Sequence, residues 1–92
     1  MVQISTSLAQ EFGRVLRQRR IEAGVSQEEL AYIADVDRTF VSMLERGLRT
    51  PGLGVVLLLA QALGTTGADL VLEVEARLAQ CDTELLQNYE LR

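Results

Sequence analysis

The side chains that could carry out chemistry in this 92-residue chain are few, and their types exclude most catalytic mechanisms. There is no His, all nine basic residues are Arg rather than Lys, and Cys81 is the only Cys. His–Cys zinc sites, Ser–His or Cys–His nucleophile pairs, Ser–Lys dyads, Schiff-base lysines and phosphate-binding P-loops therefore cannot form within one chain. We expect no enzymatic activity, no metal and no cofactor.

The Arg side chains are the remaining basic groups, and they are unevenly distributed. Residues 1–54 contain seven Arg and seven acids, whereas residues 55–92 contain two Arg and six acids. The net charge of −4 therefore belongs to the C-terminal part. Because the distribution of charge matters more than its total, the acidic balance does not exclude a nucleic-acid partner for the N-terminal part.

Three features predict a cytoplasmic protein without membrane contact. A single Cys cannot make an intrachain disulfide, which fits a reducing compartment. Residues 1–10 have neither the basic start nor the apolar run of a secretory signal. The longest apolar run, residues 55–60, is far shorter than the roughly 20 residues that cross a bilayer.

The elements that must position the Arg side chains all have the apolar spacing of helices. A first helix is predicted from about Ser7 to the left-handed cap Gly24. Its apolar stripe consists of Leu8, Phe12, Val15, Leu16 and Ile21.

Two short helices should follow, each with a clear start signal. Ser26 and Glu29 form a capping box, and Asp37 can cap the next helix. Only residues 35–37 separate the two helices, and so short a connection forces a sharp crossing, which is the helix-turn-helix arrangement. The expected inward residues are Leu30, Ala31, Ile33 and Ala34 in the first of them and Val41 and Leu44 in the second, where an inward Phe40 is left open.

Two further helices complete the prediction. One runs from about Leu53 to Leu63 before Gly64, and its expected inward stripe is Leu53, Val56, Leu57, Ala60 and Leu63. The other starts with a capping box of Thr66 and Asp69 and meets no Gly or Pro afterwards. We expect Val71 and Val74 to pack on the domain's own core.

Four ordered blocks of sequence then show a family resemblance. They are L-R-x-x-R-x-x-x-G-x-S-Q-x-x-L-A (residues 16–31), V-D-R-T-F-V-S-x-L-E-R-G (36–47), R-x-P (49–51) and L-A-x-A-L-G (59–64). Over about residues 12–72 the chain resembles the lambda-repressor-like helix-turn-helix family, also called XRE or Cro-like. Its length and the phrases LAY (30–32) and DRTF (37–40) are most similar to small controller proteins of restriction–modification systems. One departure is Asp35, because the family usually has Gly at this left-handed position.

The resemblance implies a fold and a domain organisation. The fold is an all-α, compact five-helix DNA-binding domain with the helix-turn-helix at its second and third helices and an extended C-terminal helix. The single domain spans residues 1–92, with its core at about 8–72 and a helical extension at about 73–92.

The resemblance also implies which residues contact DNA, because the third helix of this family enters the major groove. Arg38 is the candidate for reading guanine, and its alternative is a surface ion pair with Asp35 or Asp37. Gln27 should hold a phosphate and buttress the reading helix. The remaining candidates are Thr39, Ser42 and Met43 for the groove and Arg46 and Arg49 for phosphates. Arg20 should pair with Glu45 in a structural role, tying the first helix to the third.

An excess of apolar residues in the last two helices predicts a homodimer. A surplus apolar face on a small domain usually marks an interface, and the last helix also has a heptad-like spacing. The expected interface residues are Val55, Leu58, Leu59 and Ala62, followed by Leu78, Cys81 and Leu85.

Together these features predict a homodimeric transcription regulator that binds a palindromic double-stranded DNA operator and acts in the cytoplasm, at the nucleoid. A controller of a restriction–modification system is the narrower hypothesis, and RNA polymerase is a further candidate partner. The alternative is an antitoxin-like or adaptor protein whose C-terminal helix binds another protein.

Overall fold

The computed structural model describes the backbone of residues 4–90 and the side chains of residues 8–80. The helices are α1 (Ile4–Ala23), α2 (Gln27–Ala34), α3 (Arg38–Glu45), α4 (Leu53–Ala62) and α5 (Gly67–Glu90). The all-helical class, the five helices and the long last helix are as the sequence predicted. Helix α1 begins before the expected Ser7, because residues 4–7 contain no Gly or Pro that would prevent a helix.

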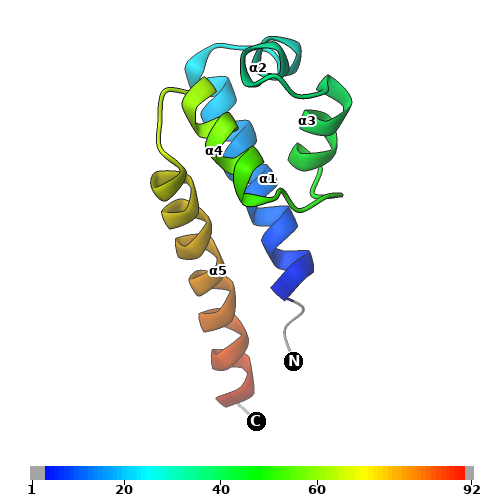
Figure 1. Cartoon of the computed structure of the whole chain (residues 1–92). Helices are drawn as coiled ribbons and strands as arrows, with labels where there is room; N and C mark the ends of the chain where they lie inside the picture. Colours follow the sequence, from blue (N-terminus) through cyan, green and yellow to red (C-terminus); the bar gives the residue numbers. More distant parts are fainter. Residues whose placement is uncertain (1–3, 91–92) are drawn as a thin grey trace.

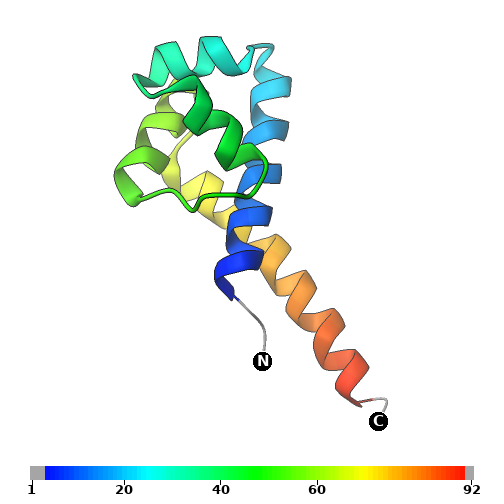
Figure 2. The same ribbon diagram turned by 90° about the vertical axis from the view of Figure 1, so that its right-hand side faces the viewer.

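The five helices are arranged so that α2 and α3 sit together at one end of α1. Figures 1 and 2 show α2 lying across that end, with α3 beside α1. Helix α5 runs along α1 and continues past the other helices toward the C-terminus (Figure 2). The α2–turn–α3 unit is therefore presented at the end of the molecule away from the tip of α5.

One leucine from each helix forms the centre of the core. These side chains are fully buried, and the five residues are Leu16, Leu30, Leu44, Leu59 and Leu70. Phe12, Val41 and Val74 belong to the same buried cluster. Because every helix contributes a buried leucine, the core joins all five helices and fixes α3 relative to the others.

The predicted caps of α2 and α3 are present in the structure. Ser26 and Glu29 form both hydrogen bonds of the capping box, and the Asp37 carboxylate accepts a hydrogen bond from the Thr39 amide. Asp35 has φ 58° and ψ 47°, so it does occupy the left-handed position. The capping box predicted for α5 is only half present. The Thr66 hydroxyl accepts a hydrogen bond from the Asp69 amide, but the Asp69 carboxylate accepts one from the Thr65 hydroxyl and not from the Thr66 amide.

The expected inward face of α4 is wrong for three residues. Leu59 is fully buried rather than on the dimer face, whereas Leu53 and Leu57 are 72% and 50% exposed rather than inward. The helix is apolar at almost every position, so spacing alone cannot select the face that packs. The buried face is instead formed by Val56, Leu59 and Ala60.

Three further apolar residues lie outside the core, contrary to expectation. Ile21 and Ile33 are exposed, because the packed faces of α1 and α2 are already filled by larger sets of buried residues. Val71 is 44% exposed, whereas Val74 is buried as expected. Val55, Ala62 and Leu78, which were expected at the dimer interface, are half-buried against the core of their own chain.

Two of the predicted interface residues, Cys81 and Leu85, lie outside the residues whose side chains the structure describes. No single helix within the described residues combines the length and apolar character needed to cross a membrane. Helix α4 and residues 67–80 of α5 reach that length and apolar character only when taken together, and the two helices meet at a bend of 108°. Residues 8–80 contain no cluster of three or more possible metal ligands.

Candidate nucleic-acid interface

Helix α3 has one buried face and one outward face, and the outward face is polar except for Met43. Val41 and Leu44 are fully buried, while Glu45 turns toward α1. At 100° per residue, the opposite face contains Arg38, Thr39, Ser42, Met43 and Arg46. The structure therefore brings together on one face all the α3 residues that the sequence predicted to contact DNA.

Arg38 begins this face and is free to reach a ligand. Its side chain is exposed, and no carboxylate among residues 8–80 pairs with its guanidinium. The alternative of an ion pair with Asp35 or Asp37 is therefore absent, and Asp37 is occupied in capping α3. An unpaired guanidinium can present two donors to the O6 and N7 acceptors of guanine.

Arg46 and Arg49 flank the turn after α3, and both side chains are exposed. Arg46 donates weakly to the Ser42 carbonyl at 3.4 Å. The guanidinium of Arg49 lies over the Phe40 ring, 5.7 Å from its centre. Neither Arg is neutralised by a carboxylate in the part of the chain that the structure describes, which suits both to contact phosphates.

Glu45 joins three helices beneath the reading face. Its carboxylate accepts hydrogen bonds from Arg20 Nε at 2.6 Å, from Arg20 Nη2 at 3.0 Å and from Gln27 Nε2 at 3.0 Å. The side chains of Arg20 and Glu45 are only 13% and 3% exposed. The hydrogen bonds with Glu45 raise the pKa of Arg20 above its ordinary value, against the effect of burial. The predicted structural pair is thus present, and Gln27 buttresses α3 through it.

Gly13 sets the distance between α1 and α3. A Cβ at this position would lie 2.4 Å from the Leu44 carbonyl oxygen and 2.7 Å from that of Glu45. Sequence reasoning did not identify this residue. The signal was available, because Gly in the middle of a helix costs about 1 kcal/mol relative to Ala and so points to a close contact.

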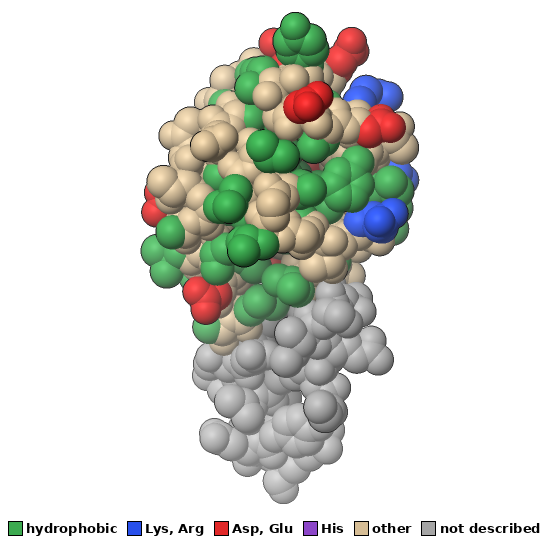
Figure 3. All heavy atoms as spheres, viewed as in Figure 1, with side chains coloured by type: hydrophobic (Ala, Val, Ile, Leu, Met, Phe, Trp, Pro, Cys, Tyr) green, Lys and Arg blue, Asp and Glu red, His purple; other side chains and the backbone are tan. Residues whose placement is uncertain are grey.

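On the face of the molecule drawn in Figure 3, the basic side chains and the apolar side chains of α4 and α5 lie in different places. In the view of Figure 3 the basic side chains lie on the side of α3, and apolar side chains spread over α4 and α5. The exposed apolar residues of those two helices are Leu53, Leu57, Leu58, Val71 and Leu72. The basic surface and the apolar surface can therefore meet different partners.

The comparisons with known proteins agree with this geometry. The family profile described as a helix-turn-helix domain matches residues 11–73. The chain belongs to the helix-turn-helix family of DNA-binding regulators. Helix-turn-helix regulators of this XRE-like group are not enzymes, in agreement with the expectation from the side chains.

Several relatives of this helix-turn-helix protein are controllers of restriction–modification systems. The chain is 39% identical to control protein C.BamHI of Bacillus amyloliquefaciens over 61 residues, which cover 65% of this chain and 75% of the relative. It is 40% identical to the restriction–modification controller C.AhdI of Aeromonas hydrophila, with a TM-score of 0.66 over 67% of this chain and 94% of that one.

A third relative matches more of the chain. The clp gene regulator ClgR of Corynebacterium glutamicum is 31% identical, with a TM-score of 0.77 over 89% of this chain and 88% of that one. The lambda-repressor-like fold that the sequence predicted is thereby confirmed. The roles of the individual α3 side chains remain predictions.

Proposed function

We propose that this helix-turn-helix protein is a homodimeric regulator that binds a palindromic operator through the outward face of α3. The observation that carries the proposal is the unpaired, exposed Arg38 at the start of α3, on a helix held by the Glu45 network. In this arrangement Arg38 reads a base, Thr39, Ser42 and Met43 line the groove, and Arg46 and Arg49 contact phosphates. The protein would act in the cytoplasm, at the nucleoid.

The proposed dimer uses the exposed apolar residues of α4 and α5. We define this surface, called the α4/α5 face, by Leu53, Leu57, Leu58, Val71 and Leu72. It is continuous with an open apolar hollow of about 290 Å³, to which Leu53 and Val71 contribute together with Phe12 and Leu78. An exposed surface of this kind on a small domain favours association. A two-fold dimer would place two α3 helices about 34 Å apart, one turn of the duplex.

One domain is proposed for the whole chain. The buried cluster takes residues from all five helices and includes Val74, and Leu78 packs against it. The first part of the proposed C-terminal extension, from residue 73, is thus continuous with the core.

A restriction–modification controller is the narrower function proposed. Its support is the likeness to C.BamHI and C.AhdI, whose names describe them as control proteins. Selection from a randomised duplex pool with the purified protein tests the proposal. A two-fold symmetric site bound by two copies is expected. An enriched asymmetric site, or no enriched site, would contradict it, and a monomer that assembles only with a second protein would favour the antitoxin-like alternative.

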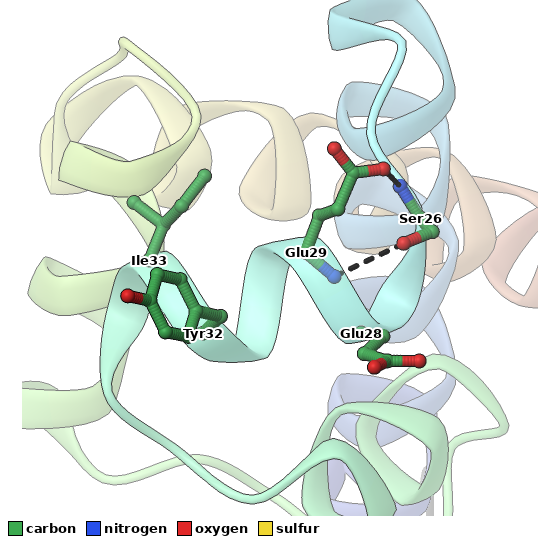
Figure 4. A pocket seen from close by; sticks show the side chains of 5 residues that line it. All are labelled: Ser26, Glu28, Glu29, Tyr32 and Ile33. Atoms are coloured by element: carbon green, nitrogen blue, oxygen red, sulfur yellow. Dashed lines mark hydrogen bonds between the residues drawn. The ribbon is translucent and has the colours of Figure 1, made fainter.

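RNA polymerase, proposed as a further partner, would meet the outer face of α2. Tyr32 is 87% exposed, and Ile33 beside it is also exposed. Figure 4 shows the two side chains together at the end of α2, with Glu28 and the capping box of Ser26 and Glu29 at its start. The acidic groups disfavour contact with phosphates and leave this surface open to a protein.

Replacing Tyr32 with Ala tests this partner. We expect operator affinity to stay within about twofold, because the side chain does not belong to the α3 face, while activated transcription in a purified polymerase assay falls several-fold. Equal transcription by the variant and the parent protein would exclude this surface as the polymerase contact.

A further inference from the structure

The contact between Phe40 and Arg49 is made possible by the turn that ends α3. Gly47 has φ 73°, and the amides of Gly47 and Leu48 donate to the carbonyls of Leu44 and Met43 at 3.1 and 2.9 Å. This left-handed ending turns the chain back along α3. Arg49 thereby returns to the first half of the helix, where it meets the ring of Phe40.

The Phe40 ring is held by contacts with the core. Phe40 is half-buried and packs against the core cluster. The Arg49 guanidinium lies over the ring, with its central carbon 5.7 Å from the ring centre. This is within the roughly 6 Å at which the face of an aromatic ring attracts a cation.

Arg49 is held differently from the four Arg side chains that form ion pairs in the described part of the chain. Arg14, Arg19, Arg20 and Arg77 each pair with a carboxylate. For Arg49 the described residues offer the ring and no carboxylate. A ring restricts the motion of a guanidinium without neutralising its charge, whereas a carboxylate would compete with a phosphate for the same donors.

We propose that Phe40 is a positioning residue, which holds the Arg49 guanidinium in place for a phosphate of the duplex. The proposal rests on the proposed DNA-binding function and adds the means by which an exposed loop side chain is ordered before binding. Phe40 has no hydroxyl and needs none, because it acts through its ring on Arg49. Less side-chain freedom is then lost when the phosphate is bound.

A double-mutant cycle on DNA affinity tests the proposal. The four proteins are the parent, Phe40→Leu, Arg49→Ala and the double variant, titrated into a labelled mixed-sequence duplex of about two helical turns at several salt concentrations. Arg49→Ala should lower the log–log salt slope by close to one unit for each bound copy. Phe40→Leu should weaken binding roughly 2- to 5-fold per copy in the parent, because the attraction of a ring for an exposed cation is modest.

The decisive comparison is made in the Arg49→Ala background. If Phe40 acts through Arg49, the Phe40→Leu change should have no further effect there. The same loss in both backgrounds would overturn the inference, because it would show direct DNA contact or a general structural role. Phe40→Tyr keeps the ring face and should retain the parent affinity, and a loss equal to that of Phe40→Leu would also overturn the inference.

Two controls separate this result from other failures. Thermal melting of each variant shows that all are folded at the temperature of titration, and Phe40→Met replaces Phe40→Leu should the latter be unfolded. A parent protein that binds no duplex would overturn the proposed function, and the inference with it. Normal binding by the parent with additive losses would overturn the inference alone.

Discussion

Glu45 shows how one buried side chain can control the reading helix. Its carboxylate is almost fully buried and accepts hydrogen bonds from Arg20 of α1 and Gln27 of α2. A buried charge is tolerated only when it is paired and hydrogen-bonded. Here the Glu45 carboxylate is paired with the Arg20 guanidinium and also accepts a hydrogen bond from the Gln27 amide. The orientation of α3 therefore depends on a residue that does not itself face the DNA.

Removing the Glu45 carboxylate should destabilise the fold. Glu45→Ala leaves the largely buried Arg20 guanidinium without a carboxylate, with the Val25 carbonyl as its remaining acceptor, at an expected cost of about 3–5 kcal/mol in the free energy of unfolding. Glu45→Gln keeps the shape and one acceptor, and its cost should be smaller. Urea titration followed by circular dichroism measures both variants. An unchanged midpoint for Glu45→Ala would show that the pair contributes nothing to stability.

Arg38 and Arg46 should differ in what their loss does to DNA binding. Arg38→Ala should cost about 1–3 kcal/mol at the selected site and relax preference at one base pair in each half-site. Arg46→Ala should weaken all duplexes alike and reduce the salt slope by about one unit per copy. Binding to a panel of single-base variants distinguishes the two. Full discrimination by Arg38→Ala would assign the base contact to another residue.

At the scale of the helices, the sequence identifies ends better than faces. Ser26, Asp37 and Gly24 act on amides and carbonyls within a few residues, so their effects could be predicted from local sequence. The inward face of α4 could not be predicted, because that helix has apolar residues on all its sides and only its packing against α2 and α5 selects Leu59 over Leu57. Gly13 was missed for the same reason. It matters because the backbone of α3 lies so close to it, and local sequence does not show that approach.

The approach of α1 to α3 gives a test at this scale. Gly13→Ala would place a methyl group 2.4 Å from a carbonyl oxygen that cannot move alone, so the helices must separate. We expect a net loss of about 1–3 kcal/mol despite the better helix propensity of Ala.

Gly54→Ala is the matched control for Gly13→Ala. It lies in α4 and its Cβ would meet no atom within 4 Å, so it should be neutral or stabilise by up to about 1 kcal/mol. Thermal melting compares the two variants. Equal stability of both would show that the α1–α3 contact is not tight.

At the scale of the whole molecule, the site was predictable because its residues are close in the sequence. Arg38, Thr39, Ser42 and Met43 lie in one short helix and Arg46 caps its C-terminal end, so helical geometry alone places them on one face. The α4/α5 face joins two helices bent by 108°, and its membership depends on their packing. Of the predicted interface residues whose side chains the structure describes, Leu58 is the one that lies in this face.

Leu58 therefore gives the sharpest test of the proposed dimer. It is 44% exposed, lies off the buried side of α4 and is absent from the core cluster. In a dimer its remaining surface would be covered by the partner, and Leu58→Asp would instead place two like charges near the two-fold axis. We expect a monomer with unchanged helical content, because Val56, Leu59 and Ala60 still pack. Sedimentation equilibrium measures the association.

The matched control is Ile21→Asp, which makes the same kind of change at an exposed apolar residue of α1 outside the α4/α5 face. That variant should remain a dimer with parent affinity for the operator. Leu58→Asp should lose most operator affinity, because each half-site alone offers half of the contacts. Its preference within a half-site should persist, because Arg38 is unaltered. A Leu58→Asp protein that is still a dimer at micromolar concentration would place the interface elsewhere on the chain.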